Sequence, residues 1–560
     1  MDDSAVETRV EWREWGQDAF DAADALNKPV LLSLSATWCS HCHEMDRETY
    51  DEPRIAANVN DGFVPVRVDV DRHPRVRDRY NMGGFPSTVF LTPEGEVLTG
   101  AGYLGVDGMR QVLDSVREMW DGKRASAGRV PRALQGNDTP AGELTADIES
   151  NLVGQLMAAY DEQAGGWGEA EKFPLPRTVE FALKREREQA LRSLNAVSAN
   201  LLDDYEGGFF RFAGNPDWTD VHYEKVLDTN AALVRAFANA YLLTGKEELR
   251  QPAASTVDYL TTTLWTGEAF AGSQAAGEGR DYYAAEASDR ESMPAPPVDE
   301  TVFADWNALA VDALLTYHGY TDDEGARRYA GRALSHLVDD LVDDGVVTHY
   351  RTTGADDEVG ASGLLVDHAR VVGALTRARQ VLGPDALDDT AADADVLATA
   401  RAVADHAIET LRSGQSFVDG PREGAGLLDR PLRPLDGNVE FADALCDLAV
   451  LTGEDRYREV ARETLAAFAG AADRFGVRIA AYGSAVSRLL NEPLVIAVTA
   501  EAGSDLHRAA LRMADHEKVV VPAAEGYDAT DAAYVVRGDE TSEPATTPEE
   551  LGRRVSELVR

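Results

Sequence analysis

The stretch of sequence that decides the fold runs from Val30 to Met45 and reads Val-Leu-Leu-Ser-Leu-Ser-Ala-Thr-Trp-Cys-Ser-His-Cys-His-Glu-Met. Its first half is a short apolar run after Pro29, which predicts a buried strand over 30–36. The residues that follow favour helix, so the strand leads directly into a Cys-x-x-Cys at a helix start. There, unpaired N–H groups and the positive end of the helix dipole stabilise the thiolate of Cys39, and Cys42 can form a disulfide with it.

The segments around this stretch follow the order expected of a thioredoxin-like α/β domain. We expect helices over 15–26, 53–59 and 107–120, and strands over 63–70, 89–91 and 97–99. A Cys-x-x-Cys after the first strand of an αβαβαββα order is the thioredoxin pattern. Pro86 precedes a central strand, where such a domain places its cis-proline, because proline cannot donate to a strand ladder.

Dithiol chemistry is our first interpretation of the two cysteines, and three alternatives stay open. Residues 39–43 also spell a C-x-x-C-H haem-attachment motif, but covalent haem needs export and we find no export signal. A zinc site needs four ligands, and beyond the two cysteines only His41, His43 and His73 could contribute. The third alternative is a thioredoxin fold with little redox turnover.

Two positions tune the expected chemistry. His41 would, when charged, stabilise a neighbouring thiolate and make the pair more oxidising. Typical thioredoxins carry a buried aspartate six residues before the first cysteine, and this chain has Ser33 there. A proton shuttle for reductase activity is therefore not provided at that position.

Composition limits the classes of partner. The 560 residues carry a net charge of −44, spread along the whole chain. We interpret this charge as halophilic, because high salt screens self-repulsion; an acidic surface for a basic partner is the alternative. Phosphates would be repelled, so we expect no nucleic-acid partner. With three cysteines, no apolar leader in residues 1–18 and no apolar run long enough for a bilayer, we expect a reduced cytoplasmic protein with no membrane partner.

The rest of the chain divides into a linker, a helical body and a short α/β segment. We place the thioredoxin-like domain at 1–122, the Gly- and Pro-rich linker at 123–143, the body at 144–491 and the last segment at 492–560. In the body, amphipathic helices are expected near 144–160, 178–202, 224–244, 249–264, 303–318, 323–342, 361–382, 391–412, 437–452, 456–471 and 480–490. No exact repeat period is seen, so a closed toroid of helical hairpins is favoured over a solenoid.

The last segment has the pattern of a small α/β unit. Strands are expected over 494–500, 518–522 and 533–536, with helices over 504–514 and 548–559. We interpret it as a parallel-sheet unit. It has no Gly-rich phosphate loop, so we assign it no nucleotide.

Several motifs resemble one known family over nearly the whole chain. Trp38 to Met45, Val68-Asp69-Val70-Asp71 and Gly84-Phe85-Pro86 are similar to the DUF255-type thioredoxin domain of the YyaL and spermatogenesis-associated protein 20 family. In the body, similar segments are Gly165 to Gly168, Lys172-Phe173-Pro174, Gly207 to Phe212, His222 to Asn230, Asp305-Trp306-Asn307 and Gly437-Asn438. The resemblance implies that the body is like the (α/α)6 barrel of six-hairpin glycosidases and sugar epimerases.

The chain departs from the family pattern at two places. The family usually has histidine where this chain has Phe210, and an acidic cluster where this chain continues Ser273-Gln274 with two alanines. These losses weaken a carbohydrate-active interpretation.

The segment around His222 is the second candidate site. We expect a helix that begins near Tyr223 and brings Glu224, Lys225 and Asp228 within one turn. These groups could perform acid–base chemistry or bind a polyol, with aromatic side chains stacking on a sugar face. The alternative is that they form buried ion pairs and that the aromatics are core. The candidate substrate-binding residues of the helical cavity are His222, Glu224, Lys225, Asp228, Asn230, Trp167, Trp306 and Asn307.

The sequence thus predicts a thiol–disulfide redox protein of unknown substrate. Cys39 would attack, Cys42 would resolve, Pro86 would shape the substrate groove and His41 would tune the potential. A protein thiol or disulfide is the expected partner, and we expect no metal or other cofactor. One alternative is a carbohydrate-active or sugar-binding protein that uses the helical cavity, and another is a non-catalytic scaffold.

Overall fold

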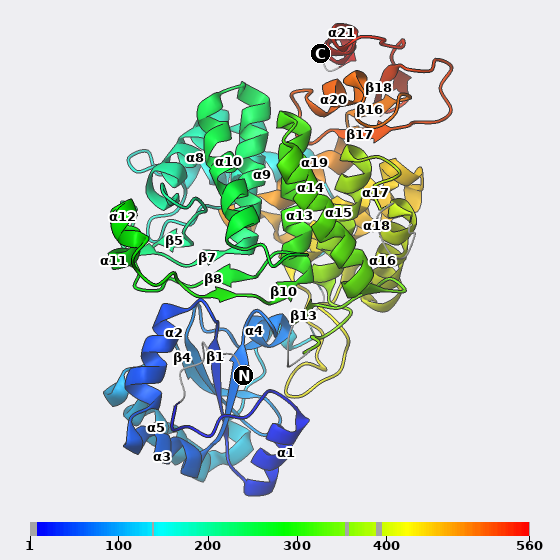
Figure 1. The fold of residues 1–560 in the computed structure, drawn as a ribbon. Helices are drawn as coiled ribbons and strands as arrows, with labels where there is room; N and C mark the ends of the chain where they lie inside the picture. Colours follow the sequence, from blue (N-terminus) through cyan, green and yellow to red (C-terminus); the bar gives the residue numbers. More distant parts are fainter. Residues whose placement is uncertain (1–7, 137–138, 353–357, 388–394, 559–560) are drawn as a thin grey trace.

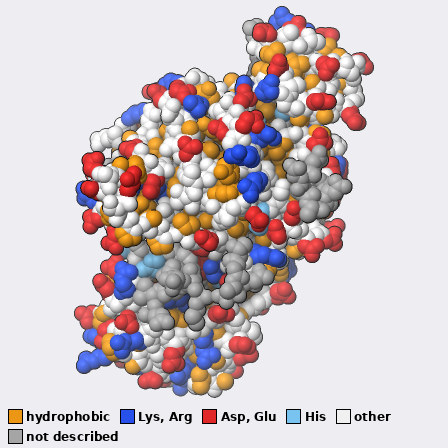
Figure 2. All heavy atoms as spheres, viewed as in Figure 1, with side chains coloured by type: hydrophobic (Ala, Val, Ile, Leu, Met, Phe, Trp, Pro, Cys, Tyr) orange, Lys and Arg blue, Asp and Glu red, His pale blue; other side chains and the backbone are white. Residues whose placement is uncertain are grey.

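The computed structural model describes residues 8–136, 139–352, 358–387 and 395–558. Three parts follow one another along the molecule (Figure 1): a thioredoxin-like domain at one end, a ring of helices in the middle and a small α/β unit at the other end. Acidic side chains are spread over all three parts of the face seen in Figure 2.

The N-terminal domain is built on one mixed four-stranded sheet. Its strand order is β2-β1-β3-β4, with β1 parallel to β2 and antiparallel to β3. The strands are β2 (Val64–Asp69), β1 (Val30–Ser35), β3 (Ser87–Leu91) and β4 (Val97–Ala101). The helices are α1 (Gln17–Leu26), α2 (Ser40–Met45) with a π-helical extension over 46–50, α3 (Pro53–Gly62), α4 (Pro74–Tyr80) and α5 (Val106–Lys123). The fold is thioredoxin-like, as the sequence predicts.

The helical body is a closed ring of six helical pairs, which confirms the (α/α)6 toroid. The inner helices are α7 (Pro176–Arg185), α9 (Leu227–Thr244), α13 (Ala304–Thr321), α15 (Leu365–Val381), α17 (Leu435–Thr452) and α19 (Ala481–Leu490). Their outer partners are, in the same order, α8 (Arg187–Leu201), α10 (Glu247–Thr262), α14 (Glu324–His336), α16 (Val396–Thr410), α18 (Asp455–Ala466) and α6 (Ala146–Ala158). The ring closes because α19 contacts α7, and the first helix of the body, α6, packs on the last one.

Two expected helices of the body differ from the structure. The range 178–202 is two helices rather than one, because Glu186 leaves the helical conformation with φ −133° and ψ 59°. The helix expected near Tyr223 begins only at Leu227, because Lys225 and Val226 form the short strand β7 (Lys225–Val226) and pair with β8 (Ser273–Gln274).

The C-terminal unit also contains a mixed sheet, of strand order β17-β16-β18-β19. Its elements are β16 (Val495–Val498), α20 (Asp505–Leu511), β17 (Val519–Pro522), β18 (Ala533–Arg537), β19 (Glu540–Thr541) and α21 (Pro548–Leu558). Only β16 and β17 are parallel; β18 is antiparallel to both of its neighbours. The expectation of a parallel-sheet unit is therefore wrong.

None of the helices in the described ranges is long and apolar enough to cross a bilayer.

Candidate functional site

The two cysteines lie where strand β1 ends and helix α2 begins. Cys39 is the N-cap of α2, and its Sγ accepts a hydrogen bond from the backbone N–H of Cys42 at 3.2 Å. The two residues form a disulfide with their Cα atoms 5.2 Å apart, and each is less than 5% exposed. The Phe85–Pro86 peptide bond directly before β3 is cis, as the sequence predicts.

Loops of the helical ring cover this motif. The Arg211 guanidinium lies 4.1 Å from the centre of the Trp38 ring, and the His222 ring lies 5.6 Å from the His41 ring. The Thr37 hydroxyl donates to a carboxylate oxygen of Asp299 at 2.8 Å. The Cys-x-x-Cys therefore lies at the seam between the thioredoxin-like domain and the ring.

A cavity of about 350 Å³ opens at this seam. It is large enough for a small molecule. The thioredoxin-like domain contributes Trp38 and Phe85, the residues that directly precede Cys39 and Pro86. The ring contributes aromatic, acidic and basic side chains, which include Phe173, Trp306, Asp228, Asp305, Arg211 and Arg370. Aromatic walls and charges of both signs thus surround a space shared by the two domains.

A buried aspartate, Asp71, and a half-buried one, Asp69, lie beside the redox motif. The Trp38 indole donates to Asp71 at 2.6 Å, and Asp69 caps the same turn by accepting from the backbone N–H of Asp71 at 2.9 Å. Burial and the neighbouring Asp69 raise the pKa of Asp71 to about 8. Burial raises the pKa of Asp69 to about 6, so at least one proton is held here near neutral pH.

On the ring side of the same seam, two further acids surround a buried histidine. His349 Nδ1 lies 2.8 Å from Asp367 Oδ1, and His349 Nε2 lies 2.8 Å from the backbone oxygen of Asp71. Burial opposes the charged imidazole, but the Asp367 carboxylate prevails and raises the pKa of His349 to about 9. Burial also raises the pKa of Asp305 to about 6, although Arg370 donates to it at 2.8 Å.

The predicted acid–base cluster is divided between two environments. His222 lies in strand β6 (Val221–His222), and its ring stacks on the Phe212 ring with their centres 3.9 Å apart. Its Nδ1 lies 3.7 Å from Oε1 of Glu224. Glu224 also faces Arg211, and although burial opposes ionisation, His222 and Arg211 hold the pKa of Glu224 below its usual value. Asp228 lines the cavity. Glu224 therefore lies with His222 and Arg211 at the seam, whereas Lys225 does not.

Lys225 is turned toward the other side of its strand. Its Nζ donates to Asp203 and to the backbone oxygen of Gly207, both at 2.8 Å, and Arg290 pairs with the same aspartate at 2.9 Å. Lys225 is therefore part of a buried ion-pair network inside the ring.

Asn230 and Asn307 act as clamps for the ring. Asn230 bonds the backbone N–H and C=O of Phe209 and the carbonyl of Val226, four residues before it. Asn307 does the same with Phe270 and Phe303. A third clamp, Asn438, bonds Phe417 and Pro434 in the same way. These amides are fully used by the backbone and are not available to a ligand.

The two tryptophans proposed as stacking platforms also separate. Trp306 lines the cavity. Trp167 is 2% exposed and packs edge-on against Tyr160 at 5.8 Å, away from the cavity-lining residues. Of these two tryptophans, Trp306 alone lines the cavity and could stack on a ligand there.

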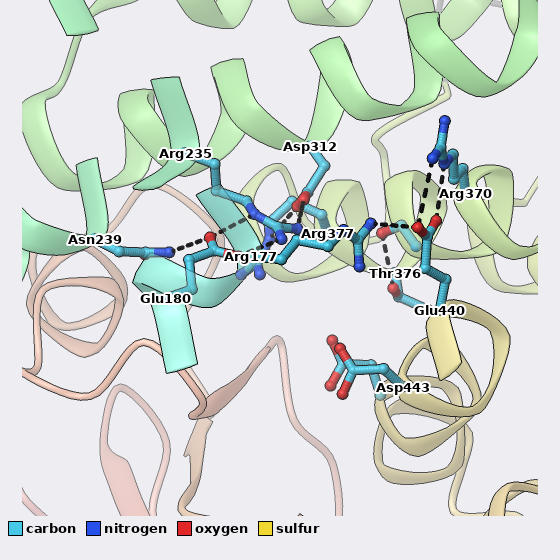
Figure 3. A network of polar contacts seen from close by, with 12 residues as sticks. Arg177, Glu180, Arg235, Asn239, Asp312, Arg370, Thr376, Arg377, Glu440 and Asp443 are labelled. Carbon is cyan, nitrogen blue, oxygen red and sulfur yellow. Dashed lines mark hydrogen bonds and ion pairs between the residues drawn. The ribbon is translucent and has the colours of Figure 1, made fainter. Parts of the chain in front are cut away.

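The axis of the ring is filled by charges that pair with one another (Figure 3). Arg235 pairs with Glu180 at 2.7 Å, Arg377 with Asp312 at 2.8 Å, and Arg370 with Glu440 at 2.8 Å. Arg177 and Arg370 overcome the effect of burial and lower the pKa of Glu440 to about 2. The two cavities beside these groups measure about 80 and 100 Å³, so the cavity at the seam, of about 350 Å³, offers more volume for a ligand than either.

His349, Asp367 and the raised pKa of Asp71 were not predicted from the sequence. His349 and Asp71 are 278 residues apart in the chain, and their contact has no local signal. One signal was available: Asp-x-Asn occurs at the start of α9, α13 and α17, as Asp228-Thr-Asn230, Asp305-Trp-Asn307 and Asp436-Gly-Asn438. This repeat marks the same position of three inner helices.

Comparisons with known proteins match the N-terminal domain to a family model. Residues 3–135 match the family model Thioredox_DsbH, described as "Protein of unknown function, DUF255". Spermatogenesis-associated protein 20 of Homo sapiens is 29% identical over 343 residues, which cover 55% of this chain and 42% of that protein. The chain thus spans less than half the length of this relative.

More distant similarities concern single domains. Protein disulfide isomerase-like 2-2 of Oryza sativa subsp. japonica is 31% identical over 103 residues, 18% of this chain and 26% of that protein. Among solved structures, cellobiose 2-epimerase from Spirochaeta thermophila DSM 6192 matches with a TM-score of 0.44 and 18% identity, over 57% of this chain and 83% of that one.

Proposed function

Because this chain belongs to the YyaL and spermatogenesis-associated protein 20 family, with a DUF255 thioredoxin-like domain, we propose that it is a thiol–disulfide oxidoreductase. The observation that carries the proposal is the Cys39–Cys42 disulfide at the start of α2, in the same domain as the cis Phe85–Pro86 peptide. The similarity to proteins named protein disulfide isomerase supports it.

The thiol–disulfide exchange proceeds in two steps. The Cys39 thiolate attacks a substrate disulfide, a mixed disulfide forms, and one substrate thiolate leaves. The Cys42 thiolate then attacks Cys39 Sγ and releases the second substrate thiolate. The substrate gains two electrons and the protein keeps the Cys39–Cys42 disulfide; the reverse sequence oxidises a dithiol. The hydrogen bond from the Cys42 N–H to Cys39 Sγ favours the thiolate of Cys39.

The seam restricts the substrate. Both cysteines are almost fully buried, and the ring residues Arg211 and His222 contact their immediate neighbours Trp38 and His41. A folded protein must displace these loops, whereas a small disulfide can use the adjacent cavity. We therefore place small disulfides before protein disulfides as substrates.

The first experiment is the alkylation rate of Cys39 against pH in the reduced protein, followed by mass spectrometry at high salt. We expect a midpoint well below the free-thiol value of ~8.5. Cys446 is an internal control, because burial raises its pKa to about 12. A Cys39 thiol that stays inert up to about pH 9 would overturn the proposal and leave a scaffold role.

A second experiment tests the restriction on substrates. The variant Cys42→Ser should trap mixed disulfides through Cys39, and should react with an aromatic small-molecule disulfide at least tenfold faster than with insulin. Adding Cys446→Ser to the Cys42→Ser variant is the matched control and should leave its rates with both disulfides unchanged. Equal rates with insulin would show that the seam opens freely.

Sugar binding is a second candidate function, favoured by the side chains of the cavity. Trp306 offers a stacking face, and Asp228 and Asp305 offer hydrogen-bond acceptors in the same space. A bound sugar should raise the melting temperature of the protein. Cellobiose, glucose and mannose are the probes, Trp306→Ala should remove the shift, and Trp167→Phe should keep it. No shift with any of them would remove this candidate.

A further inference from the structure

Three buried side chains of the ring converge next to the cavity. They are Asp305 near the start of α13, His349 directly before β13 (Tyr350–Arg351), and Asp367 near the start of α15. One ligand atom from each lies within 4.8 Å of the other two. The three residues are 4%, 2% and 0% exposed, so bulk water does not solvate their charges.

The hydrogen bonds of His349 fix which nitrogen is free to act. The backbone oxygen of Asp71 can only accept, so His349 Nε2, 2.8 Å away, carries a proton and donates. The other nitrogen, Nδ1, faces a carboxylate oxygen of Asp367 at 2.8 Å. A histidine that donates one ring N–H to a backbone carbonyl and turns the other nitrogen toward carboxylates has the arrangement common to metal-binding histidines.

The two carboxylates keep one oxygen each without a hydrogen-bond partner among the described residues. Asp305 Oδ2 accepts a hydrogen bond from Arg370, and the buried Oδ1 has no hydrogen-bond partner among the described residues. Asp367 faces His349 with Oδ1, and its buried Oδ2 has none. A buried carboxylate oxygen without a hydrogen-bond partner is unfavourable, so two of them beside one histidine call for a ligand.

We propose that Asp305, His349 and Asp367 form a binding site for a divalent first-row transition cation such as Mn²⁺ or Zn²⁺. One imidazole nitrogen and two carboxylates suit these ions, whereas the site has no sulfur for soft metals and its imidazole is a poor ligand for Ca²⁺ or Mg²⁺. Two carboxylates match the charge of the ion, and His349 completes the set when the ion displaces the Nδ1 proton, which leaves to solvent.

The position of the site indicates its role. Three protein ligands leave coordination positions open, as in catalytic rather than structural metal sites. Asp305 also lines the cavity at the seam, so an open position on the ion faces that space. The ion would hold an oxygen-bearing ligand there, such as a hydroxyl, carbonyl or carboxylate, beside Trp306.

The competing explanation is a metal-free ion pair between protonated His349 and Asp367. It uses the same contacts but leaves the second oxygen of each carboxylate without a partner. The two explanations differ in whether the protein takes up a cation, which is directly measurable.

The test uses the full chain with Cys39→Ser and Cys42→Ser, so that no thiolate of the redox motif can hold a metal. After dialysis against a chelator, Mn²⁺ binding is followed by electron paramagnetic resonance and Zn²⁺ binding by calorimetry. We expect one ion per chain and a rise in melting temperature with either ion. Asp367→Asn and His349→Gln should each weaken binding at least tenfold.

Two controls keep the result interpretable. Asp436→Asn removes the carboxylate at the matching position of α17 and should leave binding unchanged. Circular dichroism identifies a variant that fails to fold, and Asp305→Asn then replaces it. No uptake of Mn²⁺ or Zn²⁺ by the folded protein, or uptake that survives both Asp367→Asn and His349→Gln, would overturn the proposal. Because the background lacks both cysteines, this outcome is independent of the thiol–disulfide proposal.

Discussion

The two α/β units at opposite ends of the ring have the same sheet but different chemistry (Figure 1). In each, the central strand is parallel to one neighbour and antiparallel to the other, which pairs with a fourth strand: β2-β1-β3-β4 and β17-β16-β18-β19. A helix follows the central strand in both units, and another follows the fourth strand. The C-terminal unit thus repeats the strand order and strand directions of the N-terminal sheet, without a helix among the described residues between β17 and β18, whereas α4 lies between β2 and β3.

The residues at the first helix show what differs. Cys39 caps α2 and accepts from the N–H of Cys42, three residues later. Ser504 caps α20 and accepts from the N–H of His507, also three residues later. The cysteine pair of one unit is replaced by Ser504 and His507 in the other. The cap geometry therefore belongs to the fold, whereas the redox chemistry depends on the two thiols.

The units dock on the ring through different contacts. The N-terminal domain inserts arginines, and Arg79 pairs with Asp419 at 2.6 Å while its side chain is fully buried. The C-terminal unit contributes Glu517, which pairs with Arg185 of α7 at 2.9 Å, and His507, whose Nε2 lies 2.8 Å from the backbone oxygen of Gln380 on α15. Both side chains of the Arg185–Glu517 pair keep some exposure, so the buried pair of the N-terminal domain should be the more sensitive to substitution.

The largest effect is expected for Arg79→Met. The change leaves the buried Asp419 carboxylate with only Arg75, at 2.9 Å, and removes bonds to the backbone oxygens of Leu427 and Arg430. We expect the free energy of unfolding to fall by ~3–4 kcal/mol. Urea denaturation followed by tryptophan fluorescence measures it.

The control for this variant is Arg110→Met in the same domain. Arg110 pairs with Asp107 at 3.0 Å on the surface, and this change should cost less than about 0.5 kcal/mol. Equal losses for the two variants would show that the ion pair with Asp419 does not hold the domain on the ring.

Local sequence was enough to predict the redox motif but not its surroundings. The strand before Cys39 and the cis-proline at Pro86 depend on residues next to them, and both were predicted correctly. The pairing of β16 with β18 depends on strands far apart in the chain, and the parallel sheet expected there was wrong. The helix start at Leu227 depends on pairing of Lys225 with Gln274, which no local pattern reveals.

A buried lysine, Lys518, directly precedes β17 of the C-terminal unit. Burial, with Arg377 nearby, lowers the pKa of Lys518 from 10.5 to about 7, and its Nζ donates to the backbone oxygen of Asp515 at 3.1 Å. Between pH 7 and 9 the unfolded chain keeps a proton on this lysine that the folded protein has released. Stability therefore rises with pH, by about 2–3 kcal/mol over this range.

The measurement is thermal or urea unfolding at pH 7, 8 and 9 in constant salt. Lys518→Met removes the titrating group and should flatten the rise, whereas Lys123→Met, on the N-terminal domain, should not. A wild-type stability that is level over this range would show that Lys518 stays charged in the folded protein.

The smallest effect is expected for substitutions of the two helix caps, Ser504 and Cys39. Ser504 Oγ lies 3.3 Å from the His507 N–H, so Ser504→Ala should cost about 1 kcal/mol, the usual value for a lost N-cap. In the reduced protein, Cys39→Ser should change the free energy of unfolding by less than about 0.5 kcal/mol, because a serine oxygen can accept the same N–H of Cys42. Hydrogen exchange at α20 and α2 localises each effect. If Cys39→Ser proved as costly as Ser504→Ala, the thiol would stabilise its helix beyond capping, and the two units would differ in fold energetics as well as in chemistry.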